Sequence, residues 1–168
     1  MANIFLIGFM GTGKTTIANA LNSKYSMEIL DMDAQIEKDE NMAIPDIFAT
    51  KGEAFFRDLE TNLVKKLQTM DNMVVSCGGG AVLRTENVAE MKKSGKIILL
   101  KATPETILER VKHSHNRPLL EGNKNVSYIR ELMSKREDKY NAAADFIVNV
   151  DDRSVNDIAD EIMKKVFG

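Results

Sequence analysis

The chain has 168 residues, of which 43% are hydrophobic and 29% charged, and its formal net charge is −2. This composition is typical of one packed globular domain, 1–168, and excludes a disordered chain. The weak charge provides no basic field for nucleic acid or an anionic membrane, and the single cysteine, Cys77, excludes an intramolecular disulfide. The apolar N-terminus, 1–7, lacks the basic start of a signal peptide and is too short to span a bilayer. We therefore expect a cytoplasmic monomer with neither nucleic acid nor a membrane as partner.

Short apolar segments alternate with longer amphipathic ones along the chain. The candidate strands are 4–7, 28–30, 73–75, 96–100 and 146–150. Between them, apolar residues recur at helical spacing in 17–21, 55–67, 129–140 and 155–166. Because helices between strands prevent tight hairpins, the expected fold class is α/β, with a five-stranded parallel sheet, right-handed crossovers and helices on both faces.

The strongest chemical motif follows the first predicted strand. Residues 8–15 read GFMGTGKT and match the P-loop pattern G-x4-G-K-[ST] between a strand and an amphipathic segment. The glycines let successive N–H groups point at phosphate oxygens, and the N-terminus of the following helix adds its dipole. Lys14 would reach the β- and γ-phosphates, while the Thr15 hydroxyl would bind Mg²⁺. The alternative is an ordinary glycine-rich turn, but the full spacing in this context favours a nucleoside triphosphate site.

The nucleotide base and the metal partner follow from motifs elsewhere in the chain. The chain holds no N/T-K-x-D segment to read guanine, which favours ATP over GTP. The third predicted strand runs through Ser76 into glycines instead of ending in an aspartate, so another carboxylate must assist Mg²⁺. Asp31 and Asp33 follow the second strand and can reach the ligand-binding edge of the sheet, one for Mg²⁺ and one for substrate. Alternatively, either aspartate simply caps the next helix.

Three arginines are candidates for binding an anion. Arg136 lies on an otherwise apolar helical stripe, where a charge is costly unless an anion meets it. Arg57 has Glu60 one turn further on, a pair that could hold the guanidinium in one pose or be a surface ion pair of little value. Arg117 lies in a polar insertion, about 112–124, with the character of a mobile lid. There it could neutralise a transferring phosphate, or be an ordinary exposed arginine.

Two other residue types suggest chemistry less strongly. Cys77 follows a strand and could act as a nucleophile, but no histidine is near it in sequence and a buried thiol is the simpler interpretation. His113 and His115 could suggest a metal site, yet two histidines on a polar loop are more simply solvated.

In combination, these residues resemble the shikimate kinase family. The resemblance covers nearly the whole chain and rests on the P-loop, Asp31-Met32-Asp33, Phe56-Arg57 with Glu60, Gly78-Gly79-Gly80, Arg117-Pro118-Leu119-Leu120 and Arg136, in that order. It implies a three-layer P-loop NTPase fold with a lid at about 112–124. It also implies phosphorylation of the 3-hydroxyl of shikimate by ATP, giving shikimate 3-phosphate and ADP, on the route to chorismate and the aromatic amino acids.

The resemblance also implies a role for each matching residue. ATP would be bound by Gly11, Thr12, Gly13, Lys14, Thr15, Thr16, Arg110, Arg117 and Arg153. Mg²⁺ would be held by Thr15 directly and by Asp31 through water. Shikimate would be bound by Asp33, Arg57, Gly79, Gly80 and Arg136. The catalytic residues would be Lys14, Asp33 and Arg117, with Asp33 able to accept the proton of the attacking hydroxyl.

Two rival functions remain at this point. A P-loop kinase for another hydroxylated substrate, such as gluconate or a nucleoside monophosphate, would share the nucleotide site. The pair of Arg57 and Arg136 argues against a neutral substrate. A non-catalytic nucleotide-binding module would bind ATP without turnover and without dependence on Asp33. The presence of Lys14, Thr15, Asp31 and Asp33 argues against this alternative.

Overall fold

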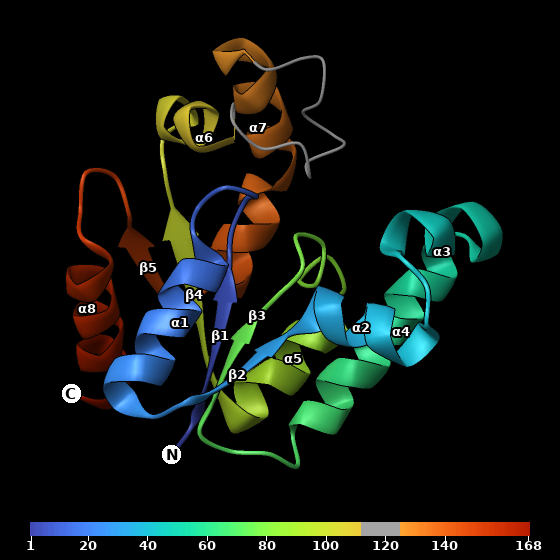
Figure 1. Ribbon diagram of the computed structural model, residues 1–168, viewed down its shortest axis with the longest axis horizontal. Helices are drawn as coiled ribbons and strands as arrows, with labels where there is room; N and C mark the ends of the chain where they lie inside the picture. Colours follow the sequence, from blue (N-terminus) through green and yellow to red (C-terminus); the bar gives the residue numbers. More distant parts are fainter. Residues whose placement is uncertain (112–124) are drawn as a thin grey trace.

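A five-stranded parallel sheet forms the centre of the computed structural model, which describes residues 1–111 and 125–168 (Figure 1). The strand order is β2-β3-β1-β4-β5. The strands are β1 (Asn3–Ile7), β2 (Glu28–Asp31), β3 (Met73–Ser76), β4 (Gly95–Lys101) and β5 (Phe146–Asn149). Because every pairing is parallel, the carboxyl ends of all five strands meet at one edge of the sheet.

Helices cover both faces of this sheet. They are α1 (Lys14–Tyr25), α2 (Met32–Glu40), α3 (Ile44–Lys51), α4 (Glu53–Leu67), α5 (Thr85–Ser94), α6 (Pro104–Val111), α7 (Val126–Ala143) and α8 (Val155–Phe167). In Figure 1, α1 and α8 lie side by side away from α4 and α5, while α3 and α7 stand on either side of the carboxyl edge. None of the helices in 1–111 and 125–168 is long and apolar enough to cross a membrane.

The alternation of side chains along the central strand divides the core into two parts. Ile4 and Leu6 of β1 point into the cluster formed with α1 and α8, whereas Phe5 and Ile7 point into the cluster formed with α2, α4 and α5. All four side chains are at most 1% exposed. Both faces of β1 are therefore buried, which explains why this strand is apolar throughout.

The predicted α/β fold class with five parallel strands is confirmed. Each strand lies within a residue or two of its predicted range; the last ends at Asn149, and Val150 is buried just beyond it. Helices α2, α3, α5 and α6 were not singled out from the sequence. Two of them, α2 and α5, have predominantly polar sequences and bury only a few residues each, so their apolar periodicity is weak.

The strand order decides which loops can meet. The central strand β1 has β3 on one side and β4 on the other, so the loops after β1 and β3 emerge next to each other. The end of β2 lies beside that of β3, where Asp31 is in register with Ser76. Crevices of this kind at the carboxyl edge are where open α/β sheets bind their ligands.

Candidate active site

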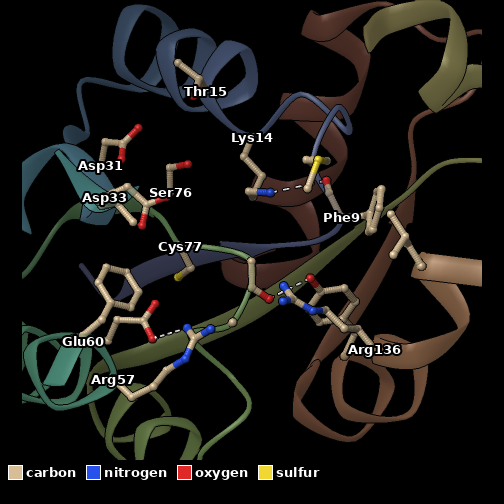
Figure 2. A pocket seen from close by; sticks show the side chains of 18 of the residues that line it. Phe9, Lys14, Thr15, Asp31, Asp33, Arg57, Glu60, Ser76, Cys77 and Arg136 are labelled. Atoms are coloured by element: carbon tan, nitrogen blue, oxygen red, sulfur yellow. Dashed lines mark hydrogen bonds and ion pairs between the residues drawn. The ribbon is translucent and has the colours of Figure 1, made fainter. Parts of the chain in front are cut away.

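A cavity of about 560 Å³ opens at the carboxyl edge of the sheet (Figure 2). Its wall is contributed by the P-loop, the ends of β2 and β3, the glycine triplet 78–80, and helices α3, α4 and α7. Lys14, Thr15, Asp31, Asp33, Arg57, Gly79, Gly80 and Arg136 all line it. The structure thus brings together residues that were predicted from five separate motifs.

The P-loop has the backbone that its glycines require. Gly11 and Gly13 have φ of +85° and +95°, a left-handed conformation that side chains disfavour, and Gly13 precedes the first residue of α1. Lys14 Nζ donates hydrogen bonds to the carbonyl oxygens of Gly8 at 2.7 Å and Phe9 at 3.4 Å. The ammonium group is therefore held over the loop, at the side facing the cavity (Figure 2).

Thr12 has a structural position inside this loop. Its side chain is buried, and both its hydroxyl and its N–H donate to the carbonyl oxygen of Phe9. Thr15 and Thr16, in contrast, are exposed in the first turn of α1. Thr15 lines the large cavity, which leaves its hydroxyl available at the place where the P-loop motif requires a metal ligand.

A second cavity, of about 440 Å³, lies on the other side of the P-loop. The residues 11–16 line it together with Arg110 from α6 and Arg153 from the segment before α8. Arg110 Nη1 donates to the carbonyl oxygen of Gly11 at 3.2 Å. Arg153 is held by the carbonyl oxygen of Asn149 at 2.9 Å and by an ion pair with Glu161. Arg110 and Arg153, both expected to bind ATP, thus line the same cavity.

Asp31 and Asp33 have different environments. Asp31 ends β2 and caps α2, since its Oδ1 accepts the N–H of Ala34 at 3.1 Å. The helix-cap interpretation therefore holds for Asp31, although the residue also lines the cavity. Asp33 is the second residue of α2 and directs its carboxylate into the cavity (Figure 2). Burial raises the pKa of Asp33, as does the negative charge of Asp31, while Lys14 and Arg57 oppose the rise.

Arg57 and Glu60 form a buried pair on α4. Arg57 Nη1 lies 2.7 Å from Glu60 Oε1, and the side chains are only 14% and 1% exposed. This burial rules out the interpretation as a surface ion pair. Burial also raises the pKa of Glu60, and the hydrogen bond from Arg57 opposes this rise. Glu60 Oε2 accepts no hydrogen bond from the part of the chain that the structure describes.

Each glycine of the triplet 78–80 lies against a different charged side chain. A Cβ on the first glycine would lie 2.6 Å from Asp33 Oδ1, and one on the second would lie 2.7 Å from Arg136 Nη1. A Cβ on the third would lie 2.6 Å from Arg57 Cζ. None of the three has a positive φ, so space and not backbone conformation requires glycine here. The triplet lets three charged groups from α2, α4 and α7 approach one loop.

We expect Gly79→Ala to weaken the binding of an acidic substrate in this cavity without unfolding the protein. The new methyl group would meet Arg136 Nη1, the far end of a flexible side chain that can move aside. A displacement of about 1 Å at a binding group can cost up to 10²-fold, so the KM for the acid should rise at least tenfold. Steady-state kinetics would check this. The KM for the nucleotide should not change, and an unaltered KM for the acid would contradict the expected crowding.

Several residues of the cavity were not singled out from the sequence. Ile44 and Phe48 of α3 form an apolar wall together with Phe56, which belongs to the motif Phe56-Arg57. Phe48 packs against Phe56 with ring centroids 4.9 Å apart. Lys135 and Leu132 of α7 also line the cavity. Apolar wall residues look like core residues in sequence, so only the fold can show that they face a ligand.

The remaining candidates are either buried or outside the described part of the chain. Cys77 is 1% exposed, and burial raises the pKa of its thiol, which keeps it protonated and unreactive. Arg117, the predicted lid at about 112–124, and the two histidines His113 and His115 lie outside the described residues.

The five-stranded parallel sheet and the P-loop beside a charged cavity are typical of P-loop kinases that act on small molecules. The model of the shikimate kinase family matches residues 10–167. The chain belongs to the shikimate kinase family, and its activity is the ATP-dependent phosphorylation of shikimate.

Similar proteins cover the whole chain. The shikimate kinase of Persephonella marina is 42% identical over 166 residues, covering 99% of both chains. That of Caldanaerobacter subterraneus is 40% identical, covering 98% of this chain and 95% of its own. The solved shikimate kinase of Acinetobacter baumannii in complex with shikimate matches with a TM-score of 0.88 at 32% identity, over 98% of this chain and 92% of that one.

Proposed function

We propose that the large cavity binds shikimate with its carboxylate between Arg57 and Arg136 and its ring hydroxyls at Asp33. The observation that carries this proposal is the convergence of both guanidinium groups, from α4 and α7, on the cavity that Asp33 also lines (Figure 2). Paired guanidinium groups are suited to a carboxylate because they bind it in a fixed orientation. The bare backbone of Gly79 and Gly80 lets the guanidinium groups of Arg136 and Arg57 lie directly against this loop.

ATP would occupy the second cavity, with its phosphates on residues 11–16. The N–H groups at the start of α1 and the positive end of its dipole favour bound phosphate oxygens. Arg110 and Arg153 would lie on either side of the adenine, because both line this cavity beside the P-loop. Lys14 lines both cavities and is therefore placed where the γ-phosphate would meet shikimate.

The residues at the junction of the two cavities fit Mg²⁺. Thr15 and Asp31 present oxygen atoms to the same cavity, and Mg²⁺ takes one or two protein oxygens together with water and substrate phosphates. Within 1–111 and 125–168 no three acidic, histidine or cysteine side chains cluster to hold a metal by themselves, which agrees with such a shared site. When bound, Mg²⁺ would supply positive charge to the β- and γ-phosphates.

Transfer would then be an in-line displacement. A bond forms between the 3-hydroxyl oxygen of shikimate and the γ-phosphorus, and the bond from that phosphorus to the β-γ bridging oxygen of ATP breaks. Asp33 would accept the hydroxyl proton, and its raised pKa makes it a better base than an ordinary aspartate. Lys14 would stabilise the charge on the transferring group. Arg117, which lies outside the described residues, keeps this role on its motif alone.

We also propose that residues 1–168 act as one domain and as a monomer. This proposal is supported by the cavity, because one chain contributes all of the parts that meet there. These parts are the P-loop, the two aspartates, the glycine triplet, Arg57 and Arg136. No residue from a second copy is needed to build the wall between α4 and α7.

Arg136→Ala tests the position of the substrate carboxylate. Removing one partner of a desolvated charge pair costs about 2–5 kcal/mol, so kcat/KM for shikimate should fall roughly 30- to 4,000-fold, mainly through KM. Shikimate methyl ester, which is uncharged, provides the matched comparison: its already weak turnover should hardly change. An ADP-release assay with both substrates measures this. Equal losses for acid and ester would show that Arg136 does not bind the carboxylate.

A further inference from the structure

Tyr140 lies beside both the glycine triplet 78–80 and Arg136, and the proposed shikimate site gives its hydroxyl no role. Tyr140 lies on α7 one turn after Arg136, so both side chains project from the same face of the helix. Its Oη donates a hydrogen bond to the carbonyl oxygen of Gly79 at 2.8 Å. A Cβ added to Gly79 would meet Arg136 Nη1 at 2.7 Å and Tyr140 Oη at 3.7 Å. Three polar groups therefore converge at one point of the loop.

The phenol is also tied to the guanidinium. Burial raises the pKa of Tyr140, while a hydrogen bond with Arg136 and the positive charge of that residue oppose the rise. The Arg136 guanidinium therefore lies beside the phenol, whose hydroxyl donates to the Gly79 carbonyl oxygen. These contacts lead from Arg136 to the backbone beside the large cavity.

The ring of Tyr140 makes this link rigid. Tyr140 is 5% exposed and packs in the core cluster that includes Phe5, Ile7 and Leu99. A buried phenol has few alternative positions, whereas an arginine side chain on a helix has many rotamers to lose when it binds an anion. A guanidinium that is already held against the loop loses less of this freedom on binding.

We propose that Tyr140 is a positioning residue for shikimate: its hydroxyl fixes Arg136 against the Gly79 carbonyl so that the guanidinium is oriented for the substrate carboxylate before binding. Tyr140 lines the cavity but acts through Arg136, and it takes no part in proton or phosphoryl transfer. The inference rests on the proposed role of Arg136 as a carboxylate ligand.

The test is a double-mutant cycle of Tyr140→Phe and Arg136→Ala. Tyr140→Phe keeps the ring and removes only the hydroxyl. In the otherwise unchanged enzyme, the KM for shikimate should rise about tenfold, the worth of one hydrogen bond, with kcat and the KM for ATP nearly unchanged. In the Arg136→Ala background, the same change should alter kcat/KM by less than about twofold, because the residue through which Tyr140 acts is gone.

Tyr25→Phe is the matched control. Tyr25 also uses its hydroxyl in a hydrogen bond, to Asp160 of α8, but on the part of α1 that lies far from the cavity. Its loss should leave the KM for shikimate unchanged. Thermal unfolding of all variants shows that each is folded at the assay temperature.

Two results would overturn the inference, and they are distinguishable. A Tyr140→Phe loss of equal size in both backgrounds would mean that the hydroxyl supports the fold and not Arg136. If Arg136→Ala itself left the KM for shikimate unchanged, Arg136 would not bind the substrate carboxylate, and the role inferred for Tyr140 would fail as well. A tenfold effect confined to the background with Arg136 would establish the positioning role.

Discussion

The Asp33→Asn enzyme is expected to lose roughly 10²- to 10⁴-fold in kcat and yet to unfold at a higher temperature than the unaltered protein. Asparagine retains the shape and can hydrogen-bond a ring hydroxyl, but it accepts no proton. The gain in stability follows from the environment of the carboxylate, since burial and the neighbouring Asp31 disfavour its ionised form. The two effects have opposite signs because the charge that serves catalysis is costly in the empty site.

The pH dependence of this stability has a definite sign. The pKa of Asp33 is higher in the folded protein than its ordinary value of 3.8, so the folded state binds the proton more tightly. The stabilisation of the folded protein by this proton is fully present below pH 3.8 and is lost as the pH rises through the pKa of Asp33 in the folded state. The advantage of Asp33→Asn should therefore be full at neutral pH and shrink as the pH falls toward 3.8.

The activity of the unaltered enzyme should also depend on the ionisation of Asp33. Asp33 must be ionised to accept a proton, so kcat should decline on acidification at a higher pH than an ordinary aspartate would give. Thermal unfolding and kcat, each measured from neutral pH down to the ordinary aspartate pKa of 3.8 for both proteins, check the two expectations together. A lower unfolding temperature for Asp33→Asn at neutral pH, or retained kcat, would contradict this account.

Lys14→Met is expected to lower kcat by about 10²- to 10³-fold, with a much smaller effect on the KM for shikimate. Methionine keeps the apolar stem but not the ammonium group that lies over the P-loop carbonyls of Gly8 and Phe9. The lost charge matters most in the transition state, when negative charge on the transferring group is greatest. Single-turnover measurements at saturating ATP separate this step from nucleotide binding.

Lys24→Met provides a matched control for this prediction. Lys24 lies on the same helix, α1, but pairs with Asp160 at the surface, with Nζ 2.7 Å from Oδ1. Its replacement removes one positive charge of the same kind at a distance from the phosphates and should leave kcat unchanged. Equal losses in the two variants would mean that net charge or folding, and not the position of Lys14, is responsible.

Much of the fold follows from short-range patterns in the chain. The P-loop could be placed because strand, glycine turn and helix succeed one another within about 20 residues, and each has a local signal. The five strands could be found because both faces of a parallel sheet are covered and its strands are apolar throughout. Their order could not, because nothing within β3 shows that it lies between β1 and β2.

The charged residues of the site could be predicted from the sequence, but most of the contacts that they make could not. Arg57 with Glu60 could be paired from helical spacing. That Glu60 is buried, with an Oε2 that accepts no hydrogen bond from residues 1–111 and 125–168, depends on packing from elsewhere in the chain. For Asp31 the sequence left two interpretations, a helix cap or a cavity residue. Both hold, because Asp31 caps α2 and also lines the cavity. Tyr140 looked like part of an apolar stripe, and only the fold shows where its hydroxyl points.

The crowded glycine triplet also limits how the protein can evolve. Any side chain at positions 78–80 would displace a charged group that a helix contributes to the cavity, so a substitution there would disturb the site even where the fold tolerates it. Ile44, Phe48 and Leu132 reach the same cavity from helices and face no such obstacle. A descendant enzyme that accepts a differently shaped acid would therefore diverge first at this apolar wall, while the loop beside the carboxylate stayed fixed.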